Sequence, residues 1–239
     1  MLKVELLHST PLWVVSKAIR KCWASEGKSD TYKCISTGIH YGEDVHTGIR
    51  SEIGEKDKAL IHKVGNKNKH SSVLRHLNYT FDISGISTKT LLAFTRHKAG
   101  VDFSVQSTRY TTKKRKDELG FTKSGDIRID SKLHTIMELI QEAISEGVSN
   151  DDLSLLLPQA YQYSTIVTMN AQAIQHFLKL RTNPSAHYDI RNLAYAIYDN
   201  LPEEHKYLFK ESIYKPTEDT RVNQVRKEIL DIAKNHNEK

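Results

Sequence analysis

The segment Leu77–Ile83, which reads Leu-Asn-Tyr-Thr-Phe-Asp-Ile, alternates strictly between apolar and polar side chains. Alternate side chains of a β-strand point to opposite faces, so this pattern predicts a half-buried strand. A Ser84-Gly85 turn is expected to end the strand, and Ser87 is expected to cap a helix that runs through Leu91 and Phe94. A strand followed by an amphipathic helix indicates a fold of mixed α and β structure.

Further elements are predicted on both sides of this segment. Residues 25–54 are rich in Gly, Ser, Thr and charge, and are expected to form an insertion at the surface. Without an internal repeat or a low-complexity linker, residues 1–215 are expected to form a single domain. Residues 216–239 are expected to form a C-terminal helical extension, whose apolar seam at Val222, Val225, Ile229 and Ile232 suits docking on its own domain or on another subunit. Spacing predicts a strand over Lys3–Leu7 and helices over Leu12–Trp23, Lys56–Val64, Leu133–Ile144, Met169–Leu180, Ala186–Tyr198 and Glu203–Phe209.

The composition narrows the class of protein. A chain of 239 residues with 38% hydrophobic side chains can bury a substantial core. No apolar run approaches membrane-spanning length, and the first residues lack a signal-peptide pattern, so we expect a cytoplasmic protein without a membrane partner. The net charge of +6 favours an anionic partner. Cys22 and Cys34 provide neither a disulfide framework nor a C-x-x-C metal pair.

Residues capable of chemistry gather in three segments. The predicted helix that follows the Leu77–Ile83 strand leads to Arg96-His97-Lys98. A short segment separates these residues from Ser107-Thr108-Arg109-Tyr110. Two cationic clusters joined by a flexible segment suit a bound anion, because a guanidinium matches phosphate bidentately and hydroxyls complete the site. The other two segments are His70–His76 and the predicted helix that carries Gln172 and His176.

Metal sites and nucleophile pairs are poorly supported by the same residues. His62, His70 and His76 have no acidic or thiolate residue beside them to complete a metal site, and Cys34, His40 and His46 fall in the irregular insertion. Ser107 and His97 could form a nucleophile pair, but they have no nucleophile elbow and no acid partner. No G-x-G-x-x-G or P-loop is present. Composition and spacing therefore predict an anion-binding α/β protein without a metal, and leave nucleotide and nucleic acid open.

Together the three segments resemble the flavin-dependent thymidylate synthases. The signature of that family is Arg-His-Arg, a seven-residue gap and Ser, commonly followed by one residue and Arg-Tyr. This chain has Arg96-His97-Lys98, an eight-residue gap and Ser107-Thr108-Arg109-Tyr110, so it departs at Lys98 and by one residue in the gap. His70–His76 is similar to the family's H-x-[ST]-x-x-x-H, and Asn170–Arg181 to its Asn-Ala-Arg helix that ends in Leu-x-Leu-Arg.

The resemblance implies a fold and an activity. The fold would be α/β (α+β), with a twisted, mainly antiparallel sheet flanked by helices, assembled as a homotetramer with active sites between subunits. The activity would be reductive methylation of dUMP to dTMP in nucleotide biosynthesis, with 5,10-methylenetetrahydrofolate as one-carbon donor. NADPH would provide the hydride through FAD, and no enzyme cysteine would act as nucleophile. The alternatives are a basic nucleic-acid-binding module that uses Lys113–Lys116, and a family member that has lost turnover. The Lys113–Lys116 run is otherwise expected to be a solvated loop, and the resemblance implies no stable nucleic-acid partner.

The resemblance also assigns residues by position. Those expected to hold FAD are Ser72, Arg96, His97, Lys98, Asn170, Gln172 and His176, and those expected to bind dUMP are Ser107, Thr108, Arg109 and Arg181. Arg181 would be the catalytic residue, because a fixed cation against the uracil stabilises negative charge on the ring. His70 would lie near the flavin ring. Gln172 stands where the family usually has Arg, and Ser154 where some members place an Arg on the dUMP phosphate.

Overall fold

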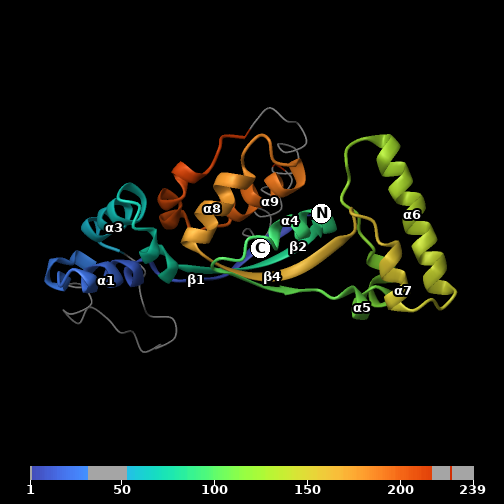
Figure 1. Cartoon of the computed structure of the whole chain (residues 1–239), viewed down its shortest axis with the longest axis horizontal. Helices are drawn as coiled ribbons and strands as arrows, with labels where there is room; N and C mark the ends of the chain where they lie inside the picture. Colours follow the sequence, from blue (N-terminus) through green and yellow to red (C-terminus); the bar gives the residue numbers. More distant parts are fainter. Residues whose placement is uncertain (1, 32–52, 217–226, 228–239) are drawn as a thin grey trace, which may run out of the picture.

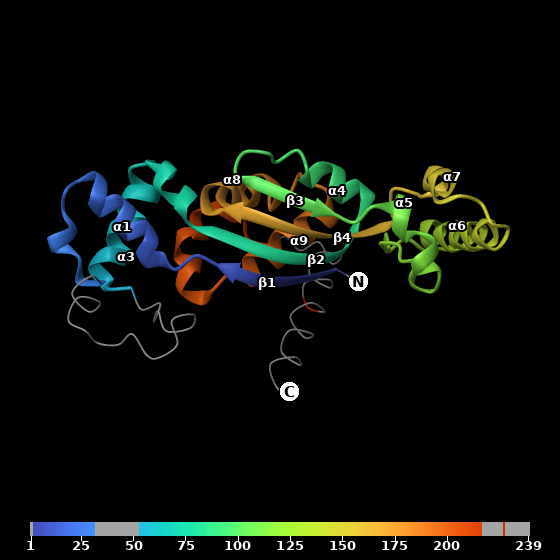
Figure 2. The ribbon, with the colours of Figure 1, turned by 90° about the horizontal axis from the view of Figure 1, so that it is seen from below.

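A four-stranded antiparallel sheet forms the centre of the molecule. The computed structural model describes residues 2–31, 53–216 and 227, so most of the predicted insertion and the seam of the C-terminal extension lie outside the described residues. The strands follow the order β1-β2-β4-β3 across the sheet (Figure 2). Their bounds are Lys3–Ser9 for β1, Asn78–Ser87 for β2, Val101–Val105 for β3 and Gln162–Asn170 for β4.

The alternation of apolar and polar residues that predicted a strand over Leu77–Ile83 is present in β2. Tyr79, Phe81 and Ile83 are fully buried, whereas Asp82 between them is exposed. The strand does not end at Ser84-Gly85, as the sequence predicted. Gly85 instead adopts a positive φ of 77°, the register with β4 shifts there, and pairing continues to the end of β2. The expected turn is therefore a bulge within a longer strand.

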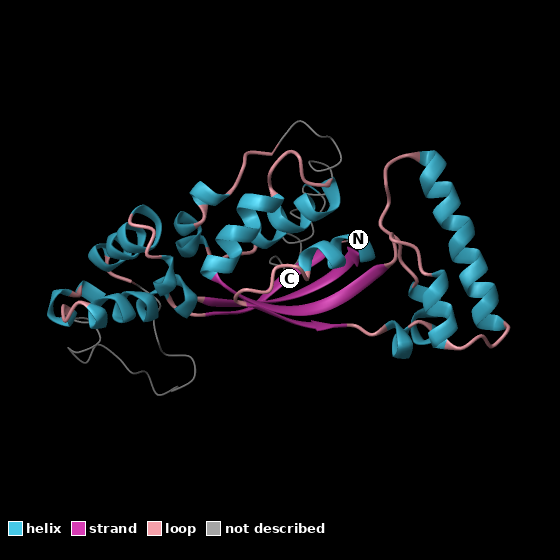
Figure 3. Cartoon of the chain, in the orientation of Figure 1, coloured by secondary structure: helices cyan, strands magenta, loops and turns pink. Residues whose placement is uncertain are grey.

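Three helices lie on the same side of the sheet in Figure 3: α4 (Thr88–Phe94), α8 (Ala171–Arg181) and α9 (Tyr188–Asp199). The side chain of Ser87 accepts a hydrogen bond from Thr90 N, which confirms the predicted cap of α4. The ring of Phe94 lies 5.0 Å from that of Phe103 and 4.9 Å from that of Phe177, so α4, β3 and α8 share one core. These contacts fix the elements that carry the candidate site.

Helices extend the sheet at both ends and make the molecule elongated (Figure 1). At one end lie α1 (Leu12–Cys22) and α3 (Glu55–Ile61). At the other end lie α5 (Thr108–Thr111), α6 (Ile127–Ser145) and α7 (Asn150–Leu153), around a small cluster of Leu119, Ile140 and Tyr161. Short helical turns, one of π type at His62–Lys67 and the others 3-10 helices, cover Glu26–Lys28, Ser71–His76, Lys113–Glu118, Ser154–Leu156, Glu203–Leu208 and Lys210–Ser212.

A buried ion pair joins α1 to α3. Arg20 donates through Nε and Nη2 to Asp57 Oδ1, at 3.0 and 2.6 Å, and the Ser29 hydroxyl donates to the other carboxylate oxygen. Asp57 is fully buried. Burial by itself would raise the pKa of Asp57, but the hydrogen bonds from Ser29 and Arg20 bring that pKa below its ordinary value. This network fixes the described residues on both sides of positions 32–52.

Three further expectations differ from the structure. Val101–Val105 is strand β3, although the sequence predicted a flexible segment there, because β4 supplies a complete antiparallel partner. The helix predicted from Met169 begins only at Ala171, because Met169 and Asn170 still belong to β4. The basic run at 113–116, expected as a solvated loop, lies in a 3-10 helix. Among the described helices, none has both the length and the apolar character needed to cross a membrane.

Candidate active site

The end of β4 and the start of α8 form one wall of the site. Asn170 ends β4 with extended backbone, and its side-chain oxygen accepts from Ala173 N at 2.9 Å, which caps α8. The buried face of α8 carries Ile174, Phe177 and Leu178. Residues four apart lie on the same side of a helix. Gln172, His176 and Leu180 are therefore aligned along another face of α8, which is turned toward a cleft.

The opposite wall is the turn between α4 and β3. It carries Arg96, His97 and Lys98, and ends at Gly100 with a positive φ of 73°. A side chain at this glycine would collide with the amide of Asn170, so the turn lies directly against the start of α8. Between the two walls is a cleft of about 610 Å³, lined by Arg75, Arg96, His97, Lys98, Ala99, Val101, Gln172, Ala173, His176, Leu180 and Arg181.

The lining of this cleft is strongly cationic. Arg75, Arg96, Lys98 and Arg181 all contribute to it, and no Asp or Glu is among the described residues that line it. Burial, and then the nearby charge of Arg96, lowers the pKa of Arg181 from its ordinary value. Like charges gathered without acidic partners repel one another, and a bound anion would relieve that repulsion. The cleft is therefore suited to an anionic ligand.

Arg181 is held in a fixed orientation inside this cleft. Its Nε donates to His97 Nε2 at 3.0 Å, and its Nη2 donates to the Ala93 carbonyl oxygen at 3.4 Å. Because His97 Nε2 accepts, the ring must be neutral with its proton on Nδ1. Burial, followed by the charges of Arg181 and His176, lowers the pKa of His97 to about 4. The neutral imidazole thus orients the guanidinium without adding a further charge.

We expect His97 to titrate near pH 4 in the folded protein, against 6.5 for a free side chain. As the pH falls from about 6.5 to about 4, the unfolded chain binds this proton before the folded chain does. The His97 contribution should therefore lower the free energy of unfolding across that window, and have no effect above it. NMR titration of the ring, assigned with His97→Gln, measures the pKa. A midpoint close to 6.5 would show that Arg181 does not use this ring as its acceptor.

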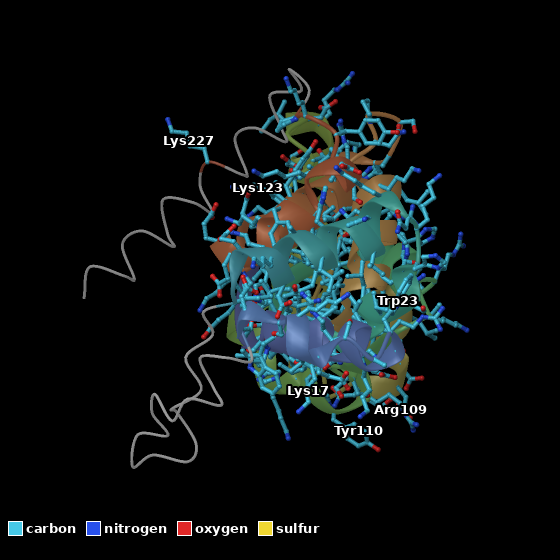
Figure 4. The ribbon with its side chains drawn as sticks, turned by 90° about the vertical axis from the view of Figure 1, so that its left-hand side faces the viewer. Lys17, Trp23, Arg109, Tyr110, Lys123 and Lys227 are labelled. Atoms are coloured by element: carbon cyan, nitrogen blue, oxygen red, sulfur yellow. The ribbon has the colours of Figure 1, made fainter. Side chains whose placement is uncertain are left out.

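A second polar cluster lies beyond the far end of β3. Ser107 precedes α5, and Thr108 and Arg109 begin that helix. Arg109 points outward (Figure 4), and its Nε and Nη2 donate to the two carboxylate oxygens of Asp151 at 2.7 and 3.1 Å. This hydrogen bond raises the pKa of Arg109 and lowers that of Asp151. Asn150 Nδ2 also donates to the Arg109 carbonyl at 2.9 Å, so α7 anchors α5 through two neighbouring residues.

The chain matches the family model described as "Thymidylate synthase complementing protein" over residues 5–205. It is 37% identical over 230 residues to the "Flavin-dependent thymidylate synthase" of Campylobacter jejuni, which covers 91% of this chain and all of that protein. The chain belongs to the flavin-dependent thymidylate synthase family. The protein of the same name from Wolinella succinogenes is 38% identical over 219 residues, 86% of this chain and 96% of that one.

Crystal structures support the same family assignment. "Thymidylate Synthase X (ThyX) from Helicobacter pylori with FAD and dUMP" superposes with a TM-score of 0.76 at 30% identity, and covers 90% of this chain and all of that one. A second structure of the same enzyme, also with FAD and dUMP, gives a TM-score of 0.74. The predicted α+β fold, with an antiparallel sheet flanked by helices, is therefore confirmed.

The residues expected from the flavin-dependent thymidylate synthase signature fall into three groups. Arg96, His97, Lys98, Gln172, His176 and Arg181 line the cleft. Asn170 lies behind it as the cap of α8. Ser72, in the 3-10 helix Ser71–His76, and His70, which precedes that helix, are exposed and do not line the cleft. Ser107, Thr108 and Arg109 lie past the other end of β3, so a single chain does not bring them to Arg181.

Sequence reasoning missed Arg75, which lines the cleft from the 3-10 helix Ser71–His76. The available signal was its place inside the H-x-[ST]-x-x-x-H motif, where Arg75 occupies a position that the motif leaves unspecified. The basic run also has structural partners: Arg115 donates to Gln106 Oε1 at 3.1 Å, and Lys113 Nζ to the Gly147 carbonyl at 3.3 Å. Within the described ranges no three potential ligands converge on a metal site; Cys34, His40 and His46 lie outside those ranges.

Proposed function

We propose that this protein is a flavin-dependent thymidylate synthase that converts dUMP to dTMP, with FAD as its bound cofactor. NADPH would be the reductant and 5,10-methylenetetrahydrofolate the one-carbon donor, and we place the reaction in the cytoplasm. The observation that carries the proposal is the cationic cleft built by the family's own signature residues and by α8. Bound FAD would supply the hydride that reduces the transferred methylene to a methyl group.

The residues of the cleft fit the cofactor. FAD carries a doubly charged pyrophosphate, and the cleft presents Arg75, Arg96 and Lys98 without a lining carboxylate. Lys98 keeps the positive charge of the family's third signature residue, although it lacks the bidentate fork of arginine. Gln172 and His176 add polar groups on the α8 wall. We assign these side chains to the phosphates and polar edges of the dinucleotide.

Arg181 is assigned to the uracil of dUMP. Its guanidinium is fixed by the His97 ring and the Ala93 carbonyl, so it needs no reorganisation when charge develops next to it. C5 of the uracil attacks the methylene most readily when the ring already carries negative charge, spread over C5 and the carbonyl oxygens. A held cation at that place lowers the energy of the charged state, and His97 keeps the cation aimed.

The phosphate of dUMP is assigned to Ser107, Thr108 and Arg109, which requires more than one chain. These residues and the Arg96–Lys98 turn lie at opposite ends of β3, whose five residues span about 15 Å at roughly 3.3 Å each. One dUMP cannot reach both ends, so a second copy must bring its Arg109 to the cleft. Exposed apolar side chains at the α6–α7 end, such as Ile127 at 79% and Leu155 at 84%, suit burial between copies. We propose that the protein is a homotetramer whose active sites lie between subunits.

Colour and turnover test this function. The purified protein should be yellow, or should bind added FAD, and should release tritium from dUMP labelled at C5 only when folate and reductant are both present. Binding of FAD without tritium release would indicate a family member that has lost turnover. If well-folded protein neither binds FAD nor releases tritium, the proposal is wrong.

Asp151 provides a test of the phosphate assignment. The carboxylate engages Nε and Nη2 of Arg109 and leaves the Nη1 side of the fork for phosphate. Since both side chains are exposed, we expect Asp151→Asn to raise KM for dUMP only about two- to fivefold, with kcat nearly unchanged. Asp152→Asn on the same helix is the control and should leave both constants alone. An unchanged KM in Asp151→Asn would mean that Asp151 does not orient a substrate-binding arginine.

A further inference from the structure

A chain of three side chains joins the 3-10 helix Ser71–His76 to α8. Arg75 Nε donates to Gln172 Oε1 at 2.7 Å, and Gln172 Nε2 donates to Ser71 Oγ at 2.7 Å. The order of these bonds fixes the amide orientation, because a flipped amide would turn its N–H groups toward the guanidinium. Both functional groups of Gln172 are thus engaged by the neighbouring turn.

The charge of Arg75 remains available in this arrangement. Gln172 is a neutral acceptor, and no ion pair joins Arg75 to a carboxylate of the described residues. Only Nε of Arg75 has a hydrogen-bond partner among the described residues, so the edge formed by Nη1 and Nη2 can meet two oxygens of an anion. That edge belongs to an exposed side chain that lines the cleft beside Arg96 and Lys98. The geometry is that of a prepared phosphate fork.

We propose that Arg75 binds a phosphate of the dinucleotide cofactor, and that Gln172 positions Arg75 instead of contacting the cofactor charge itself. The inference rests on the proposed function, because it takes FAD as the occupant of the cleft. Gln172 stands where the family usually has arginine, so α8 lacks a cation at this position. Arg75 restores that cation from the neighbouring 3-10 helix Ser71–His76, and Ser71 holds the amide that orients it.

The experiment measures release of FAD from the holoprotein. Purified protein is diluted, and the rise in flavin fluorescence reports the fraction dissociated at each concentration. Arg75→Gln should weaken FAD binding about tenfold, the loss expected for one charged hydrogen-bonding contact. Arg75→Lys should lie between wild type and Arg75→Gln, because it retains the charge and loses the fork. The control is Arg128→Gln, which removes the same charge from an exposed site on α6 and should leave FAD affinity unchanged.

A double variant separates positioning from direct contact. If Gln172 acts through Arg75, Gln172→Ala should weaken FAD binding in the wild-type background and have almost no further effect in Arg75→Gln. Salt provides a second readout, since added chloride screens a charge contact: FAD affinity should fall less steeply with salt in Arg75→Gln than in wild type. If Gln172→Ala instead weakened FAD binding by the same factor in wild type and in Arg75→Gln, the positioning role of Gln172 would be overturned.

The result also separates this inference from the proposed function. Wild-type protein that binds no FAD would overturn both. Wild-type protein that binds FAD, together with Arg75→Gln of native circular dichroism and FAD affinity within about twofold of wild type, would overturn the role of Arg75 alone. Arg75 is exposed, so its replacement is not expected to impair folding.

Discussion

Replacing Arg181 by alanine is expected to lower dTMP formation by about 10²- to 10³-fold while leaving the fold intact. The reason is that Arg181 is a preorganised cation, held at 3.0 Å by the neutral ring of His97, and removal of one such group costs about this much in kcat. Tritium release from C5-labelled dUMP measures the chemistry. Circular dichroism and the melting temperature measure the fold, which should change little because the guanidinium contributes no core packing.

The matched control is Lys179→Ala, two residues earlier on α8. Lys179 is exposed and does not line the cleft, so turnover should stay close to that of wild type. A change of the same size in both variants would point to general damage to α8. Near-normal turnover in Arg181→Ala would show that the uracil assignment is misplaced.

Asp57→Ala is expected to have the largest effect on stability. The substitution leaves Arg20, which is only 8% exposed, without its carboxylate partner, and removes the acceptor of Ser29. Loss of one member of a buried ion pair costs about 3–5 kcal/mol, because the remaining charge stays desolvated. Urea unfolding at pH 7 gives the free energy of unfolding for both proteins. Glu55→Ala on the same helix is the control, since its side chain is exposed and should change that free energy by well under about 1 kcal/mol.

The difference in free energy of unfolding between wild type and Asp57→Ala should become smaller as the pH falls. The pKa of Asp57 is lowered in the folded protein, so its stabilising contribution is complete above the unfolded pKa of about 4 and is lost as the pH falls through the lower folded value. Urea unfolding repeated below pH 4 should bring the two proteins closer together. A difference that stays constant with pH would show that the carboxylate is not the source of the stability.

The sequence predicted the parts of this structure that depend on local pattern. Alternation located β2, an N-cap serine located α4, and a helical period located α8, although the predicted helix began two residues too early. Motif order then assigned the flavin-dependent thymidylate synthase family, which the relatives confirm. For each of these three elements the information lies within about ten neighbouring residues. Such signals are readable because side-chain direction follows from backbone geometry alone.

The missed features depend on partners far away in the sequence. The sequence predicted a flexible segment where β3 lies, and this segment forms a strand because it pairs with β4, whose paired residues lie 60 to 68 positions later. β4 was not predicted either, and its last two residues were assigned to the helix that follows. Arg75 was overlooked because the direction of a side chain on a 3-10 turn depends on what packs against it, here Gln172. The distance between the Arg96–Lys98 turn and Ser107–Arg109 was missed for the same reason, because it depends on β3 being extended.

The turn at Ala99-Gly100 has a consequence for comparing sequences within the family. Val101 pairs with Met169 and Val105 with Thr165, so β3 is locked into a ladder in which one inserted residue would reverse the facing of every side chain after it. The turn lies outside that ladder, and the left-handed backbone of Gly100 lets the chain reverse tightly over Asn170. We therefore expect the extra residue of this signature gap to be absorbed at the turn, and homologous sequences of different gap length to be aligned with their insertions there.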